Sequence, residues 1–127
     1  MRAIVADTSL FIRAERGDAQ AVDRVGRLLS ERWGVAAVTL YELRCKAGMP
    51  RTLRDFYADL FWLATVHPVT REAAEIAAEV SAARPRPYRA PDALIAGVAI
   101  ARGARVVTAD AGFPRPPGLE VELVLPS

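Results

Sequence analysis

The sequence predicts an α/β fold in which helices cover both faces of a central parallel sheet. Short apolar runs alternate along the chain with longer segments whose apolar residues recur at helical spacing. The short runs lack the polar alternation of a half-exposed strand, which is typical of parallel strands buried on both faces. We therefore expect a three-layer α/β/α sandwich with a central parallel sheet of four or five strands.

Five runs are candidates for the strands of this sheet. The three most apolar runs, expected to be buried, are residues 3–6, 35–38 and 105–108. Two weaker runs, 66–69 and 121–125, should lie nearer the edges. Pro68 favours an edge position for the first of these, because proline cannot donate a hydrogen bond to a central ladder.

Four longer segments have the pattern of helices: residues 18–33, 53–64, 71–84 and 91–102. The first two carry apolar stripes, which comprise Val22, Val25, Leu28, Leu29 and Trp33, and then Phe56, Tyr57, Leu60, Phe61 and Ala64. Trp62 projects from the opposite side, where it either anchors an interface or packs under a neighbouring helix. The last helix is apolar nearly all round and must be covered on most sides. Pro91 suits its first turn and Gly103 its end.

The bulk composition fits one domain over residues 1–127, and the 52% of hydrophobic residues supports a real core. Net charge is only +2, but all basic residues except Lys46 are arginine. This balance is compatible with nucleic-acid binding and is equally explained by a GC-rich genome. Cys45 stands alone, so we expect no disulfide. No apolar run approaches the roughly 20 residues that span a bilayer, and we expect a soluble, cytoplasmic protein.

Four acids share one kind of position in this fold. Asp7, Glu42 and Asp110 each follow an expected strand, and Asp92 opens the apolar helix. The carboxyl ends of parallel strands and the adjoining helix starts form one crevice, so these side chains should gather there. Gathered carboxylates repel one another unless a cation lies among them, and oxygen ligands favour Mg²⁺ or Mn²⁺. Such a centre activates water and neutralises phosphoryl charge, which points to hydrolysis of a phosphodiester.

Each acid taken alone has a structural explanation. Asp7 precedes Thr8 and Ser9, a position from which it can help to start a helix. Residues 39–42 fit a capping box in which Glu42 bonds back to the backbone of Thr39. Asp92 suits the helix dipole, and Asp110 suits a turn before Gly112. These explanations do not account for all four acids at one end of the sheet. The other eleven acids mostly occupy polar helix faces.

Other chemistries find less support in the residues. RNA cleavage through the 2′-hydroxyl usually recruits histidine, and the only one, His67, is expected to be structural. One cysteine and one histidine disfavour zinc. A phosphotransfer receiver domain needs a lysine near its acidic pocket, and Lys46 lies in the wrong part of the chain. An RNA-binding protein that does not cleave and a metal-dependent small-molecule phosphatase remain alternatives.

The chain resembles the PIN-domain ribonucleases, and within them the VapC toxins of toxin–antitoxin modules. The resemblance spans almost the whole chain and rests on four motifs in order: Ile4-Val5-Ala6-Asp7-Thr8-Ser9, Val38-Thr39-Leu40-Tyr41-Glu42-Leu43, Pro91-Asp92-Ala93-Leu94-Ile95-Ala96 and Val106-Val107-Thr108-Ala109-Asp110. It implies that the four acids are metal ligands and catalytic residues, and that Ser9 and Thr108 support them. Many relatives carry a further Asp before the aromatic. Here Ala111-Gly112-Phe113 is shorter and uncharged, which leaves Asp110 as the only candidate for the fourth position.

The resemblance also implies an activity and partners. The expected activity is Mg²⁺- or Mn²⁺-dependent endoribonuclease cleavage of tRNA or ribosomal RNA, by a homodimer that a VapB-type antitoxin inhibits. Just upstream of Asp92, the segment 84–89 contains Arg84, Arg86, Tyr88 and Arg89. Arginine on phosphate and an aromatic under a base suit looped RNA, although a proline-stiffened connector explains the same residues.

Overall fold

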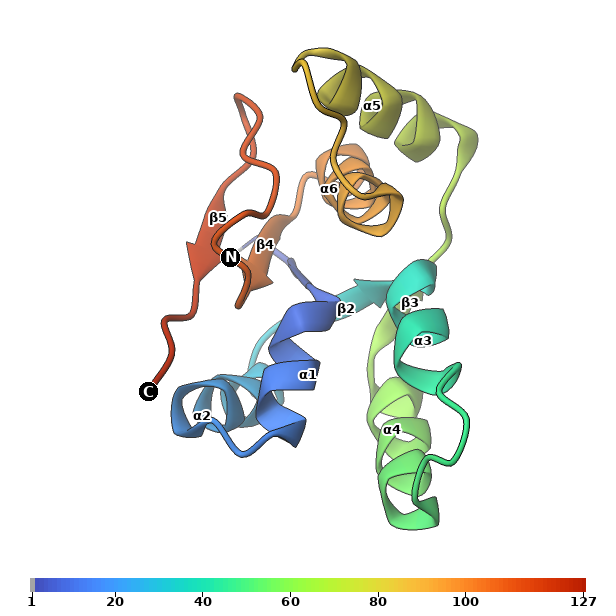
Figure 1. Ribbon diagram of the computed structural model, residues 1–127, viewed down its shortest axis with the longest axis vertical. Helices are drawn as coiled ribbons and strands as arrows, with labels where there is room; N and C mark the ends of the chain where they lie inside the picture. The colour runs from blue at the N-terminus through green and yellow to red at the C-terminus, as the bar shows by residue number, and fades with distance from the viewer. Residues whose placement is uncertain (1) are drawn as a thin grey trace.

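The structure, a computed structural model, describes residues 2–127 (Figure 1). Its centre is a five-stranded sheet of order β3-β2-β1-β4-β5 in which every neighbouring pair is parallel. The strands are β1 Ile4–Ala6, β2 Trp33–Ala36, β3 Thr65–His67, β4 Arg105–Thr108 and β5 Val121–Leu123. The predicted parallel sheet is confirmed, and the two weaker strands form its edges.

Strand β2 begins and ends two residues earlier than the predicted run 35–38. Ala37 and Val38 already belong to helix α3 (Ala37–Arg44), so the apolar run continues from the strand into the helix. Strand β3 ends at His67, directly before Pro68, which has no N–H for the ladder. The sequence pattern located the strands but did not mark where extended backbone ends.

Within the described residues, six helices connect the strands: α1 Thr8–Glu15, α2 Ala19–Leu28, α3 Ala37–Arg44, α4 Arg51–Leu63, α5 Arg71–Ala82 and α6 Ala90–Arg102. Four of them correspond to the predicted helices, and α6 ends at Gly103 in the left-handed conformation (φ +64°) as expected. Helices α1 and α3 were not assigned from the sequence. Each has only eight residues, too few for a clear apolar period.

The sheet separates two hydrophobic cores, and alternate residues of the same strands contribute to one core or the other. Ile4 and Ala6 contribute to one core, whereas Val5 contributes to the other. Val107 and Val106 divide in the same way on the neighbouring strand. Side chains of successive strand residues point to opposite faces of a sheet, so the central residues of these strands must be apolar on both faces. This is the physical reason for the apolar pair in the middle of β4 and for the fully apolar β1, whereas Arg105 and Thr108 stand at the two ends of β4.

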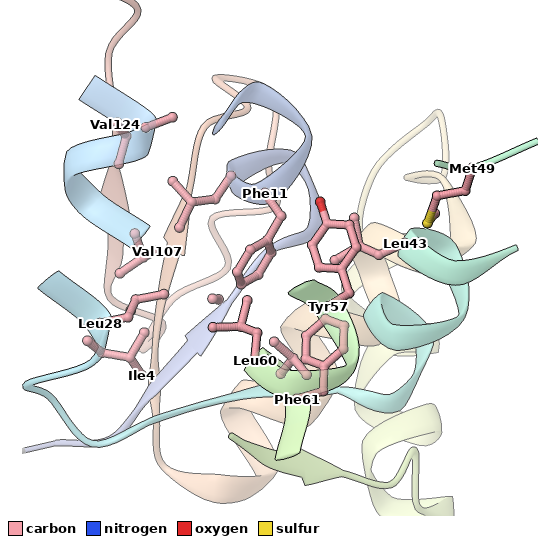
Figure 2. Packing of buried hydrophobic residues seen from close by; sticks show 14 residues of the cluster. Ile4, Phe11, Leu28, Leu43, Met49, Tyr57, Leu60, Phe61, Val107 and Val124 are labelled. Carbon is pink, nitrogen blue, oxygen red and sulfur yellow. The ribbon is translucent and has the colours of Figure 1, made fainter. Parts of the chain in front are cut away.

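The core below the sheet in Figure 1 is packed by α1, α2 and α4 and is rich in aromatic residues. Figure 2 shows the rings of Phe11, Tyr57 and Phe61 gathered between α1 and α4. Phe11 and Phe61 meet edge to face at 6.1 Å, and Tyr57 stacks on Phe61 at 5.8 Å between ring centroids. Such pairs add about 0.5–1.5 kcal/mol beyond the burial of their area.

The opposite face of the sheet is covered by α6, with α5 packed on it (Figure 1). Small residues allow these two helices to approach closely. A Cβ atom added at Gly97 of α6 would lie 2.2 Å from the carbonyl oxygen of Ala73 in α5. Glycine at this position is therefore required by the close contact of the two helix backbones.

A buried ion-pair network ties α2 to the sheet. The Arg24 side chain is only 2% exposed, and its guanidinium lies 2.5 Å from Glu31 and 2.6 Å from Glu122 of β5. Arg105 of β4 reaches the same two carboxylates, at 3.5 Å and 2.9 Å. We refer to Arg24, Glu31, Arg105 and Glu122 as the Arg24 network. It brings α2 and two neighbouring strands together through two cations and two anions.

The predicted apolar stripes are wrong at three positions. Val22, Leu29 and Phe56 are exposed rather than part of the core. Helix α2 ends at Leu28, so Leu29 lies beyond it, and Trp33 lies at the start of β2. The three exposed side chains help to line an apolar groove of about 300 Å³ between α1, α2 and α4, which we call the α1/α2/α4 groove.

The structure decides between the two positions expected for Trp62. This residue is 89% exposed, so packing under a neighbouring helix of the same chain is excluded, and Leu63 beside it is also exposed.

Across residues 2–127, no helix has the length and apolar character needed to cross a membrane.

Candidate metal centre

Three neighbouring strands carry the acids to one edge of the sheet. Asp7 directly follows β1 and is the N-cap residue of α1. Asp110 lies two residues after β4, the strand that pairs with β1. Glu42 lies on α3, which directly follows β2, and Asp92 lies in the first turn of α6. Asp7, Asp110 and Asp92 therefore lie at the predicted strand ends and helix start. Glu42 lies inside the helix that follows its strand rather than at the strand end itself.

The other three acids lie near enough to Asp92 to affect its pKa. Burial raises the pKa of Asp92 to about 6, and the charge of Asp7 contributes further in the same direction. Asp110 and Glu42 also raise this pKa, whereas Arg89 lowers it. A half-buried carboxyl group with three acids and only one arginine nearby resists ionisation unless a further cation offsets the repulsion.

Asp7 is the most deeply buried of the four acids, at 2% exposed. Its Oδ2 accepts hydrogen bonds from Ser9 Oγ at 2.6 Å and Thr108 Oγ1 at 2.7 Å. Burial raises the pKa of Asp7, and these two bonds offset part of that effect. Both residues expected to support the site thus contact Asp7 directly.

The other oxygen of Asp7 is unusual. Among residues 2–127, Asp7 Oδ1 is the one buried side-chain oxygen or nitrogen without a hydrogen-bond partner. A buried polar atom without a partner costs about 1–3 kcal/mol and calls for an explanation such as a bound ion. An acceptor-only atom beside other carboxylates fits a hard cation such as Mg²⁺. The donor set here therefore fits the metal that the sequence predicted.

Glu42 is held by a threonine that sequence reasoning missed. Thr8 Oγ1 donates to Glu42 Oε1 at 2.7 Å and lies 2.9 Å from Thr39 Oγ1. Both threonines are buried. The signal was present, because Thr8 directly follows Asp7 and Thr39 lies three residues before Glu42. The capping-box alternative is wrong, because α3 begins at Ala37 and Thr39 lies inside the helix.

The four acids do not converge on one point. In the part of the chain that the structure describes, no three Asp, Glu, His or Cys side chains are close enough together to hold one ion. The charges of Asp7, Asp110 and Glu42 nevertheless raise the pKa of Asp92, so they lie within electrostatic reach of it. These two observations agree if some ligands bind through water, since Mg²⁺ usually keeps several of its waters.

The arginine-rich segment 84–89 meets the site at one residue. Arg89 is 74% exposed, and its Nη2 lies 3.9 Å from Glu42 Oε2. The Arg84 guanidinium instead stacks 4.0 Å over the Tyr88 ring. Arg86 is exposed on the same segment. The segment therefore presents exposed positive charge beside the acids, and one face of Tyr88 is covered by Arg84.

His67 is not part of this arrangement. It ends the edge strand β3, which β2 separates from β1. Its pKa is lowered by burial and by the charge of Arg102. The structure thus places the one histidine away from the four acids, where it packs against the sheet beside Gly34.

A parallel sheet of order 3-2-1-4-5 with four acids at its carboxyl edge defines the class of protein. The family model described as PIN domain matches residues 4–119. The chain belongs to the PIN-domain family. A search of the curated proteins gave no match.

Several solved structures of VapBC proteins have the same fold. A chain of DNA-bound VapBC from Salmonella typhimurium is 24% identical, with a TM-score of 0.79, covering 98% of this chain and 100% of that one. A chain of VapBC-5 from Mycobacterium tuberculosis, described as a toxin–antitoxin system, is 28% identical, with a TM-score of 0.68 and the same coverage. A chain of VapBC2 from Rickettsia felis, bound to a promoter DNA fragment, is 18% identical, with a TM-score of 0.77, covering 94% and 97%.

Proposed function

We propose that this chain is a Mg²⁺- or Mn²⁺-dependent endoribonuclease and the toxin of a VapBC-type toxin–antitoxin pair. The observation that carries the proposal is a set of neighbouring carboxylates at the sheet edge whose charge and hydrogen bonding the protein alone does not satisfy. Asp7 keeps a buried oxygen without a donor, and burial and neighbouring acids raise the pKa of Asp92 to about 6. Such an arrangement lowers the free energy of unfolding, and a divalent cation that binds only the folded protein raises it again. The PIN-domain match and the VapBC structures support the same reading.

Asp7, Glu42 and Asp92 are the residues that would hold the metal, with Asp110 completing the set. A bound ion supplies a water of lowered pKa and neutralises charge on the phosphoryl group. Ser9 and Thr108 hold Asp7 Oδ2 by hydrogen bonds, which leaves Oδ1 as the oxygen that would bind the ion. Thr8 orients Glu42 in the same way. These bonds pre-organise the carboxylates before any ligand arrives.

We propose that substrate RNA crosses the segment 84–89 beside the acids. Arg89 is already next to Glu42, and exposed guanidinium groups bind phosphates bidentately. Arg84 and Tyr88 form a stacked pair that could extend under an unpaired base. These contacts bind backbone and bases of single-stranded or looped RNA without fixing a sequence.

For the antitoxin, we propose the α1/α2/α4 groove as the docking surface. The groove exposes apolar side chains that the fold itself leaves uncovered, among them Leu29 and Phe56. Apolar grooves of this kind receive the apolar face of a partner helix. Similar solved structures are described as a toxin–antitoxin complex and as a member of a family of toxin–antitoxin systems, which favours a second protein as the occupant. Replacing Leu29 or Phe56 with Asp should reduce binding to a co-expressed VapB-type protein encoded alongside, and unchanged binding would contradict this assignment.

We also propose that the protein forms a homodimer. Trp62 and Leu63 form an exposed apolar pair on α4, and tryptophan is enriched at the centres of interfaces. Light scattering of the purified protein tests the oligomeric state. Trp62→Ala tests whether this surface is the contact.

The nuclease proposal is tested by cleavage of a pool of tRNA and ribosomal RNA. Wild type and Asp7→Asn are compared with Mg²⁺, with Mn²⁺ and with a chelator. We expect discrete fragments that require metal and disappear in the variant. Binding of RNA without fragments would instead indicate an RNA-binding role, and turnover of a simple phosphate ester without RNA cleavage would indicate a phosphatase. Duplex DNA serves as a further control, because DNA is present in three of the similar structures.

A further inference from the structure

Arg13, which is not one of the four acids or the residues that bind them, donates hydrogen bonds to two distant backbone carbonyl groups. It lies on α1, six residues after Asp7, and its side chain is partly buried. Its Nη1 donates to the carbonyl oxygen of Val124 at 2.9 Å, and its Nη2 donates to the carbonyl oxygen of Ala109. These carbonyls belong to segments 96 and 111 residues away in the chain. A guanidinium fixed at two distant carbonyls holds those segments at a set distance from α1.

The Ala109 carbonyl belongs to the peptide group that joins Ala109 to Asp110. The N–H of the same peptide group, that of Asp110, donates to Thr108 Oγ1 at 3.0 Å. One residue earlier, the Ala109 N–H donates to Ser9 Oγ at 3.1 Å. Arg13 supplies the bond on the carbonyl side of the same peptide. The backbone that leads into Asp110 is therefore fixed from α1 by two side chains, Ser9 and Arg13.

The second anchor of Arg13 makes the arrangement rigid. The Val124 N–H donates to the carbonyl oxygen of Thr108 at 2.8 Å, so Val124 is itself tied to the end of β4. Arg13 thus closes a loop of contacts that joins α1, the end of β4 and the segment after β5. A planar guanidinium can span two carbonyls at once, whereas the single ammonium of lysine is a point charge.

We propose that Arg13 is a positioning residue, which fixes the backbone of Asp110 so that its carboxylate faces the other three acids. Charged donors form hydrogen bonds about twice as strong as neutral ones, which suits a contact that must resist loop motion. Asp110 itself lies in a turn, where the Gly112 N–H donates to its Oδ1 at 2.9 Å. The part of the proposal that concerns metal binding rests on the proposed function.

The first experiment measures the loop without metal. Amide hydrogen exchange at Asp110 and Gly112 is compared in wild type, Arg13→Gln and Arg13→Lys, with Arg27→Gln as control. Arg27 is an exposed arginine on α2 whose ion pair is with Asp23 in its own helix. We expect exchange about tenfold faster in Arg13→Gln, an intermediate value in Arg13→Lys and no change in the control. Unchanged exchange in either folded Arg13 variant would overturn the proposal.

The second experiment links Arg13 to the metal through Asp110. Titration calorimetry with Mn²⁺ should show about tenfold weaker binding for Arg13→Gln, the usual loss when a residue supporting a ligand is removed. In an Asp110→Asn background the same change should cost less than about twofold, because the residue through which Arg13 acts is already altered. An equal loss in both backgrounds would show a general structural effect and overturn the proposal. If wild type binds no Mn²⁺, the proposed function fails, and the exchange experiment still decides the role of Arg13.

Discussion

Replacing Arg24 with Met should destabilise the fold by about 2–4 kcal/mol. Arg24 is almost fully buried and forms ion pairs with Glu31 and Glu122 through separate nitrogens of its guanidinium. Breaking a buried ion pair by removing one partner typically costs about 3–5 kcal/mol. Arg105 still neutralises both carboxylates in the variant, and methionine retains part of the apolar packing, so we place the loss below the upper limit.

The assay is urea unfolding followed by far-ultraviolet circular dichroism, with two matched variants. Arg27→Met removes an exposed arginine from the same helix and should change the free energy of unfolding by less than about 0.5 kcal/mol. Arg105→Met removes the more exposed cation of the network and should cost less than Arg24→Met. A loss below about 1 kcal/mol for Arg24→Met would show that the buried pairs contribute little over their desolvation cost, and would refute the reasoning.

The pH dependence of the same variant gives an independent check. Burial alone would raise the pKa of Glu122, but hydrogen bonds from Arg24 and Arg105 hold it below its ordinary value of 4.5. The resulting stability is complete above that value and is lost as the pH falls through the lower, folded-state pKa. Between about pH 6 and pH 3, wild type should therefore lose more stability than Arg24→Met. Parallel curves would contradict this assignment.

Three further predictions concern the metal site, the RNA surface and helix packing. Mg²⁺ at a hundredfold excess over its dissociation constant should stabilise wild type by about 2.7 kcal/mol, and calorimetry should show a much smaller gain in Asp7→Asn; equal gains would exclude Asp7 as a ligand. Replacing the three arginines of segment 84–89 with alanine should weaken RNA binding and flatten its salt dependence, with a slope smaller by up to about 3, and an unchanged slope would contradict contact with phosphate. Gly97→Ala should destabilise because its Cβ meets a backbone carbonyl, whereas Gly26→Ala, with open space around its Cβ, should stabilise by about 0.5–1 kcal/mol in urea unfolding. Equal effects of the two glycine changes would show that α5 moves away at little cost.

The layers of the fold could be predicted because burial leaves a direct mark on the sequence. Strand β1 and the centre of β4 contact two cores and are therefore apolar on both faces, which is visible in the one-dimensional pattern. Helix α6 is apolar nearly all round because it lies between the sheet and α5. The same pattern failed for Val22, Leu29 and Phe56, because an apolar side chain that faces a groove has the same spacing as one that faces the core.

The positions of the four acids could be predicted from strand ends, but their supports could not. Thr8 and Thr39 are ordinary threonines in the sequence, and their contact with Glu42 depends on how α1 packs on α3. Arg13 reads as one more surface arginine of a short helix. Its role depends on carbonyls about a hundred residues away, and no local pattern encodes such a contact.

The division of the molecule by the sheet into two cores has a consequence for its fluorescence. Trp33 packs against the aromatic core, and Trp62 is exposed on α4 at the same side of the sheet. Tryptophan emission therefore reports on the layer of α1, α2 and α4, and the layer of α5 and α6 is silent. Spectra of the folded protein should contain a blue-shifted component from Trp33 and a red-shifted one from Trp62. A ligand that binds over α4 changes the emission of Trp62, whereas loosening of α5 from α6 leaves the tryptophan emission unchanged and needs another probe.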